Sequence, residues 1–287
     1  MKTSTEIASI ARHVGERKAV ELCAKAGFDG WDFSMFAMAN YNWQTRSCDP
    51  SDHPLCGKEY LQFARELRNI GESYGIRCNQ SHAPFPVNCK GVRDLLPRAL
   101  ECTAEAGGEI CVIHPDNNSS AEENAVMYQE LLEIAKPYGV KIATENMWNW
   151  DYTIDYSKFA ACADSEDFCR HLAVVNDDDF VACLDIGHAE MRGSGSGAVN
   201  MIRALGPKLQ ALHIHDNDCR WDNHQIPFSM QIDYAPIIKA LKEIGYGGWF
   251  TLEADKYLSA FDADSVSNGV KDLAASAHKL VQMWEGE

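Results

Sequence analysis

The feature of this sequence that most constrains its fold is a regular alternation of amphipathic helical segments with short apolar segments. The first pair is RHVGERKAVELCAKAG (12–27), which has helical spacing and ends in glycine, followed by the strand-like FDGWDFSMF (28–36). Six further pairs follow it along the chain. Their helical segments are 60–75, 93–108, 121–139, 165–175, 199–206 and 234–247, and the strand-like segments after them are 76–85, 109–115, 140–147, 180–188, 209–218 and 248–255. A final helix is expected over 265–286.

A weaker apolar run, TEIASIA (5–11), supplies a candidate first strand and raises the expected number of strands to eight. Repeated units of this kind require parallel strands with right-handed crossovers. Eight such units in 287 residues favour a barrel, for which about 250 residues is typical. The Gly-rich segment RGSGSGAVN (192–200) is too short for a linker and is expected to be a surface loop. We therefore predict the α/β class, a (β/α)₈ TIM barrel, as one domain over residues 1–287.

The net charge and the cysteine content indicate which kinds of partner and which cellular compartment are favoured. The formal net charge of −16 disfavours extended contact with nucleic acid, because phosphate binding needs clustered Lys and Arg. The eleven cysteines are an odd number with no C-x-x-C pair, which favours reduced thiols. The N-terminal segment lacks the apolar stretch of a signal peptide, and no run reaches the roughly 20 apolar residues of a membrane span. We therefore expect a soluble cytoplasmic protein that binds a small molecule and does not bind a membrane. The sequence does not determine the oligomeric state, and a homo-oligomer is one of the alternatives.

Chemically active side chains lie at the ends of successive strand-like segments, 28 to 40 residues apart. These residues are His82, His114, Glu145, Asp185, His213 and Glu253. Any one alone has a simpler interpretation, since a carboxylate after a strand often caps the next helix. Six in the same relative position are better explained by a shared site at the carboxyl end of the barrel, where barrel enzymes carry their active sites.

Four of these residues form a candidate metal site: Glu145, Asp185, His213 and Glu253. Three oxygen donors and one nitrogen suit Mn²⁺ first, with Mg²⁺, Co²⁺ or Zn²⁺ as alternatives. The segment HIHDNDCRWDNH (213–224) also contains His215, which points to the same face as His213 because side chains alternate along a strand. The residues alone leave the choice between these two histidines open.

At ENMWNW, LDIGH, HIHDND and TLEAD the sequence resembles the xylose-isomerase-like TIM-barrel superfamily. This superfamily includes sugar phosphate isomerases and epimerases, ketose 3-epimerases, hydroxypyruvate isomerase, inosose dehydratase and endonuclease-IV-type AP endonucleases. The resemblance implies a divalent metal held by a Glu, an Asp, a His or Gln and a second Glu. By position these ligands fall on Glu145, Asp185, His213 and Glu253, with His213 chosen because it stands three residues before Asp216.

The resemblance also implies residues that contact the substrate. SHAPF (81–85) is similar to a loop that brings a histidine, here His82, to the sugar, and His188 of LDIGH matches a residue that contacts a substrate oxygen. Arg220 lies one position away from an arginine that binds substrate in the ketose epimerases. Trp148, close to Glu145, is a candidate for stacking on the sugar. The remaining substrate-binding predictions are His114, His215 and His224.

The chemistry implied by the resemblance takes place at a carbon next to a carbonyl group. The metal would act as a Lewis acid, and Glu145 and Glu253 would be the base and the acid that move a proton through an enediolate. Reprotonation on the opposite face gives an epimer, reprotonation on the neighbouring carbon gives an isomer, and loss of a β-hydroxyl gives dehydration. The sequence thus predicts a metal-dependent sugar isomerase or epimerase acting on a ketose or related polyhydroxy carbonyl compound.

Alternative functions use the same strand-end residues. One is an inosose-type dehydratase, and another is an endonuclease-IV-like metal phosphodiesterase, for which D-x-H at 222–224 supplies further ligands. The net charge of −16 weighs against the nuclease. A barrel that only binds a sugar or a metal would not need both glutamates.

Overall fold

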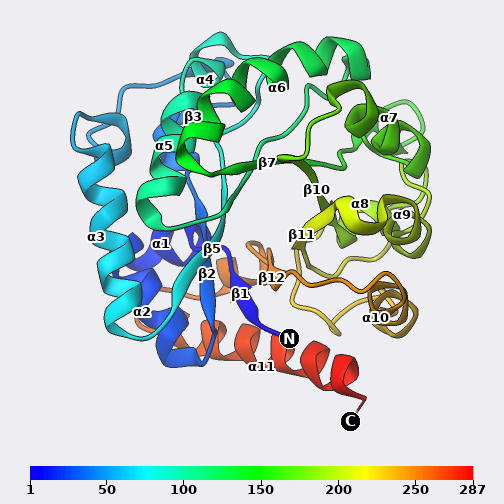
Figure 1. Ribbon diagram of the computed structural model, residues 1–287. Coiled ribbons are helices and arrows are strands. Elements are labelled where there is room, and N and C mark those ends of the chain that lie inside the picture. The colour runs from blue at the N-terminus through cyan, green and yellow to red at the C-terminus, as the bar shows by residue number, and fades with distance from the viewer. Residues whose placement is uncertain (287) are drawn as a thin grey trace.

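Eight parallel strands surrounded by helices make up the architecture of the protein (Figure 1). The structure is a computed structural model that describes residues 1–286. The barrel strands are β1 (Thr3–Thr5), β2 (Gly30–Ser34), β5 (Arg77–His82), β6 (Ile110–Val112), β7 (Lys141–Glu145), β10 (Phe180–Asp185), β11 (Leu209–His213) and β12 (Phe250–Leu252). The eight-stranded (β/α)₈ TIM barrel predicted from the sequence is therefore confirmed.

The order of the strands closes the sheet on itself. Six strands pair in the order β11-β10-β7-β6-β5-β2, and β1 pairs with β12. Isolated parallel bridges from Glu6 to Asp32 and from Ile214 to Leu252 join these two groups. Because closure brings all eight carboxyl ends to one rim, residues far apart in the sequence meet there.

Helices lie outside the strands. The helices are α1 (Ala8–Val14), α2 (Glu16–Ala26), α3 (Tyr60–Ser73), α4 (Lys90–Arg93), α5 (Leu96–Ala106), α6 (Ala121–Ala135), α7 (Ser165–Val175), α8 (Ile186–Glu190), α9 (Ala198–Leu205), α10 (Tyr234–Glu243) and α11 (Val266–Glu285). Helices α2, α3, α5, α6, α7, α9, α10 and α11 overlap the segments predicted to be helical, whereas α4 and α8 were not predicted. Helix α6 starts in a capping box in which Ser120 and Glu123 satisfy each other's backbone N–H groups.

Among residues 1–286, no helix is long and apolar enough to cross a membrane.

The N-terminal region differs from the sequence-based expectation. The first strand is Thr3–Thr5, whereas most of the segment 5–11 expected to be a strand lies in or just before helix α1. The expected single helix over 12–27 is two helices, α1 and α2, separated by Gly15. Gly15 has φ of 78° and ψ of 157°, a conformation that only glycine adopts readily and that interrupts the helical hydrogen bonds.

The interior of the barrel explains how the strand-end residues reach one site. A small apolar cluster, Val112, Ala143, Val181, Cys183 and Ala211, is 0–1% exposed between the strands. Ala143, Cys183 and Ala211 lie two residues before Glu145, Asp185 and His213. Since side chains alternate along a strand, each of these polar residues points to the same side as its small neighbour. The site therefore stands directly on this apolar layer.

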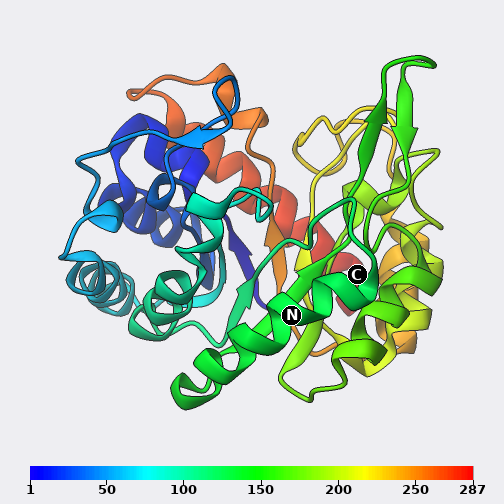
Figure 2. The same ribbon diagram turned by 90° about the horizontal axis from the view of Figure 1, so that it is seen from above.

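Two β-hairpins that the sequence did not indicate extend beyond the barrel. They are β3 (Tyr41–Asn42) with β4 (Ser47–Cys48), and β8 (Asn149–Asp151) with β9 (Tyr156–Lys158). Figure 2 shows both hairpins projecting on the same side of the barrel, the β8–β9 hairpin farthest. Both follow strands at their carboxyl ends, so they border the rim that carries the polar residues.

Candidate active site

The polar residues at the strand ends come from six neighbouring strands. His82, Glu145, Asp185 and His213 are the last residues of β5, β7, β10 and β11. Glu253 directly follows β12, and His114 stands two residues after β6. All of these side chains except His114 are less than 9% exposed.

Glu145 is the centre of the group. Its Oε1 lies 3.0 Å from Nδ1 of His213, and the same nitrogen lies 3.4 Å from Oε2 of Glu253. The other ring nitrogen of His213, Nε2, lies 3.4 Å from Oδ2 of Asp32. Nδ1 of His213 thus faces the carboxylates of Glu145 and Glu253, and Nε2 faces the carboxylate of Asp32, which orients the ring. This arrangement is typical of a metal-ligating histidine and its supporting carboxylate.

Asp185 extends the group towards the next strand. It is paired in register with His213 between β10 and β11, and its Oδ1 accepts a hydrogen bond of 2.7 Å from the backbone N–H of His188. Two fully buried oxygens, Oδ2 of Asp185 and Oε2 of Glu145, accept no hydrogen bond from residues 1–286. Buried carboxylate oxygens without donors are costly unless a cation satisfies them. The donor set of Glu145, Asp185, His213 and Glu253 therefore fits a divalent metal.

His82 and His114 lie near the second oxygen of Glu145, Oε2. Their Nε2 atoms lie 2.9 Å apart, and they lie 3.5 Å and 3.2 Å from Glu145 Oε2. Burial lowers the pKa of His114 to about 4, whereas the pKa of His82 is raised because Glu145 outweighs the opposing effect of burial. A protonated His82 can therefore donate to the neutral His114, and both rings lie close to the Glu145 carboxylate.

The two glutamates have opposite protonation preferences. Burial acts to raise the pKa of Glu145, but His213, His114 and His82 together hold it well below its usual range. Burial raises the pKa of Glu253 to about 7, and the charge of Glu145 adds to the effect. Two carboxyl groups with pKa values displaced in opposite directions are typical of an acid–base pair.

A pocket of about 1120 Å³ opens above these residues at the rim. Glu145, Glu253, His82, His114, His188 and His224 line it. One wall is aromatic: Phe85 stacks on His114 at 4.7 Å between ring centroids, and the more exposed Trp43 lies 6.1 Å from Phe85. The lining also includes Trp150 and Trp148, whose ring centroid lies 6.3 Å from that of His188. A polar floor with aromatic walls suits a polyhydroxy compound, whose C–H faces can pack on the rings.

A family model described as xylose isomerase-like TIM barrel matches residues 20–276. The chain belongs to this family. Within curated proteins, an uncharacterized protein of Methanocaldococcus jannaschii is 28% identical over 253 residues, which cover 82% of this chain and 78% of that protein. An inosose dehydratase of Yersinia enterocolitica is 23% identical over 147 residues, 45% of this chain and 46% of that enzyme.

Solved structures share the xylose isomerase-like barrel at low sequence identity. A D-tagatose 3-epimerase-like protein has a TM-score of 0.68 and 21% identity, with 98% of this chain and 100% of that chain covered. An IolI protein with a bound zinc atom has a TM-score of 0.70 and 20% identity, with 99% of each chain covered. At these identities the comparisons establish a common fold.

The structure places two of the expected substrate-binding residues away from the pocket of this xylose isomerase-like barrel. The guanidinium of Arg220 pairs with Asp155 next to the β8–β9 hairpin, and within residues 1–286 Arg220 does not line the pocket. His215 is completely buried, with its Nε2 3.2 Å from Asp185, so it lies behind the pocket surface. His82, His114, Trp148, His188 and His224 do line the pocket.

Two further carboxylates belong to the site although the strand-end pattern does not indicate them. Asp32 stands two residues before the end of β2 and contacts His213. Asp222 lies in the loop after β11 and contacts His188, His215 and His224. A carboxylate inside the strand-like segment GWDFS was the available signal for Asp32, whereas the position of Asp222 depends on how its loop folds back.

Proposed function

We propose that the protein is a divalent-metal-dependent sugar isomerase or epimerase that moves a proton at a carbon next to the carbonyl group of a ketose or related polyhydroxy compound. The observation that carries the proposal is the pair Glu145 and Glu253, which flank the same nitrogen of His213 with pKa values displaced in opposite directions. Titratable groups separated in this way supply a base and an acid on one substrate.

The positions of the site residues suggest a different role for each in the proposed reaction. Glu145 and Glu253 flank the same nitrogen of His213 and are placed to remove and to return the proton. In the metal-free protein, the three histidines hold the pKa of Glu145 well below its usual range, whereas burial raises the pKa of Glu253 to about 7. A divalent ion bound by Glu145, Asp185, His213 and Glu253 would supply Lewis-acid polarisation of the carbonyl group. The Nε2 atoms of His82 and His114 lie 3.5 Å and 3.2 Å from Oε2 of Glu145, whereas Nδ1 of His213 faces the other oxygen, Oε1.

The pocket supports a sugar-like substrate. Trp148 and Phe85 provide flat apolar faces above the polar floor, and His188 and His224 offer polar groups to hydroxyls. The relatives include an inosose dehydratase, and the similar structures include a D-tagatose 3-epimerase-like protein and an IolI protein, which is consistent with chemistry on polyhydroxy carbonyl compounds.

The test is solvent-proton exchange followed by NMR. The Mn²⁺-loaded protein is incubated in D₂O with a panel of ketoses, hydroxypyruvate and inososes. Deuterium at one carbon is expected for one of these compounds, and its position together with the product separates epimerase from isomerase. Loss of water would instead identify the dehydratase suggested by the Yersinia relative.

Variants link the exchange to the two carboxyl groups. Glu145→Gln and Glu253→Gln should each abolish exchange, while far-ultraviolet circular dichroism shows an intact fold. Activity like that of the wild type in either variant would contradict the two-carboxylate mechanism. Exchange with none of the compounds, together with cleavage of abasic DNA, would favour the phosphodiesterase instead.

A further inference from the structure

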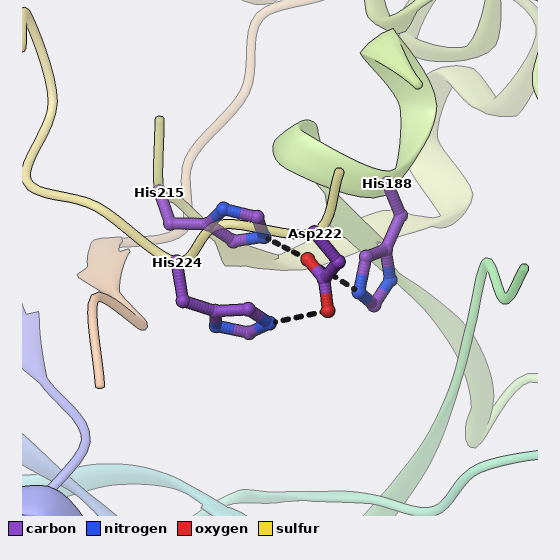
Figure 3. A group of neighbouring side chains, drawn as sticks. All are labelled: His188, His215, Asp222 and His224. Atoms are coloured by element: carbon purple, nitrogen blue, oxygen red, sulfur yellow. Dashed lines mark hydrogen bonds and ion pairs between the residues drawn. The ribbon is translucent and has the colours of Figure 1, made fainter. Parts of the chain in front are cut away.

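Two groups of polar side chains contact the proposed metal ligands. One comes from α8 and the loop after β11, and Figure 3 shows its four members, His188, His215, Asp222 and His224. The other lies among the strands of the barrel, where it reaches His213 through Asp32, and the proposed function does not use most of it. Its side chains are at most 8% exposed, and they are Ser4, Asp32, Asn79, Gln80 and Thr251.

A shift in strand register brings two consecutive residues of β5 into this buried group. The pairing of β2 with β5 becomes irregular just before Asp32, which lies opposite Gln80, so that Asn79 is an extra residue of β5. Successive side chains of a regular strand point to opposite faces. Asn79 and Gln80 nevertheless both reach Oγ1 of Thr251, at 3.1 Å and 3.2 Å. The irregularity therefore re-aims a side chain into the barrel.

The hydrogen bonds of Gln80 determine which end of its amide faces Asp32. Nε2 donates to Oδ2 of Asp32 at 2.9 Å and to the carbonyl oxygen of Leu212 at 3.5 Å. Oε1 accepts from the hydroxyl of Thr251 and from Nδ2 of Asn79. A carboxylate and a carbonyl can only accept, so the reversed amide would place an oxygen against two acceptors in a buried position. Gln80 is thus held with its nitrogen towards Asp32.

Asp32 connects Gln80 to His213. Its Oδ2 lies 2.9 Å from Nε2 of Gln80 and 3.4 Å from Nε2 of His213. Oδ1 has no hydrogen-bond partner among residues 1–286, so Gln80 is the only side chain of this part of the protein, besides His213, that donates to the carboxylate. A carboxylate in this position accepts the hydrogen on Nε2 of His213 and leaves Nδ1, which faces Glu145 and Glu253, available to a cation.

We infer that Gln80 is a positioning residue of the metal site, because its amide holds Asp32 in the orientation that fixes the ring of His213. The inference rests on the proposed function in one respect, that His213 is a metal ligand. A group of hydrogen bonds that only joined the strands would contribute to stability alone. A positioning role predicts in addition that metal affinity depends on the amide of Gln80.

The experiment measures Mn²⁺ affinity without turnover, by competition with a chelator and electron paramagnetic resonance of the free ion. Gln80→Leu removes the amide, and we expect it to weaken Mn²⁺ binding by about tenfold or more, as the loss of a partner that orients a metal ligand typically does. Mn²⁺ binding by Gln80→Leu as tight as that of the wild type would overturn the inference.

Ser81→Ala is the matched control for the loss of a buried hydrogen bond. Ser81 is the next residue of β5, and its Oγ lies 2.6 Å from Oγ1 of Thr103 on α5, so it does not belong to the group around Gln80. We expect this variant to lose stability in urea unfolding and to bind Mn²⁺ like the wild type. An equal loss of affinity in Ser81→Ala and Gln80→Leu would show a general effect of β5 packing and would refute the positioning role.

A pair of variants at Thr251 tests the same role without changing Gln80, and it decides if Gln80→Leu does not fold. Thr251→Val removes the hydroxyl that donates to Oε1 of Gln80, whereas Thr251→Ser keeps it. Weaker Mn²⁺ binding in the valine variant, restored in the serine variant, supports the inference, and equal affinities in the two variants contradict it. A wild type that binds Mn²⁺ but exchanges no deuterium into any of the compounds would instead contradict the proposed reaction and leave the role of Gln80 unaffected.

Discussion

The raised pKa of Glu253 predicts how the stability of the metal-free protein depends on pH. An ordinary glutamate ionises near pH 4.5, whereas burial raises the pKa of Glu253 to about 7 in the folded protein. Between these two values the folded protein keeps a proton that the unfolded chain has lost. Stability therefore falls as the pH rises through this window, because the folded state binds more protons.

The magnitude follows from the separation of the two pKa values. A separation of roughly 2.5 in pKa corresponds to about 3 kcal/mol, an upper value because Glu253 also interacts with His213. Glu253→Gln removes the titrating group, so the variant should gain this amount relative to the wild type between pH 4.5 and pH 7. Urea unfolding of both proteins, followed by circular dichroism across this range, measures the difference.

The metal-loaded protein is the control for this measurement. A coordinating carboxylate is held ionised, so the pH-dependent part of the difference should disappear when Mn²⁺ is bound. A difference between the metal-free proteins that stays constant within about 1 kcal/mol from pH 4.5 to pH 7 would refute the reasoning.

Three further predictions concern packing and burial. Gly187→Ala should destabilise the protein by about 3 kcal/mol, seen in thermal unfolding, because the added Cβ overlaps the ring of His215. Tyr128→Phe should cost about 1–2 kcal/mol in urea unfolding, since the buried hydroxyl donates to the carbonyl of Ile113 at 2.9 Å; an unchanged midpoint would contradict this. The six buried cysteines, such as Cys183, whose pKa burial raises to about 12, should react with a thiol reagent only after unfolding, and rapid reaction of all eleven in the native protein would show that the barrel opens.

The elements that could be predicted from sequence are those with a strong local pattern. Helix α7 occupies the predicted 165–175, and α11 lies within the predicted 265–286, because apolar spacing and flanking turn residues define such helices by themselves. The break at Gly15 was missed, since the apolar spacing continues across it and only the backbone conformation reveals the interruption. The short hairpin strands β3, β4, β8 and β9 have two or three residues each, too few for a period to be recognised.

The candidate site was predictable to the extent that barrel geometry brings strand ends together. Glu145, Asp185 and His213 terminate their strands and meet at the rim as expected. The D-x-H pair of Asp222 and His224 was visible in the sequence, but the contact of Asp222 with His188 was not, because it depends on the path of the loop after β11. Arg220, one residue away from the family position, pairs with Asp155 in the structure, and its contact with substrate stays a prediction.

Asp185 belongs to the proposed metal site and gives a last prediction. Its Oδ2 is without a hydrogen-bond donor within residues 1–286, while its Oδ1 lies 3.2 Å from Nε2 of His215. Asp185→Asn keeps the oxygen that caps α8 through the N–H of His188 but removes the charge. We expect at least a tenfold loss of Mn²⁺ affinity from the missing charged ligand. Chelator competition measures the affinity, and Mn²⁺ binding as tight as that of the wild type would show that Asp185 is not a ligand.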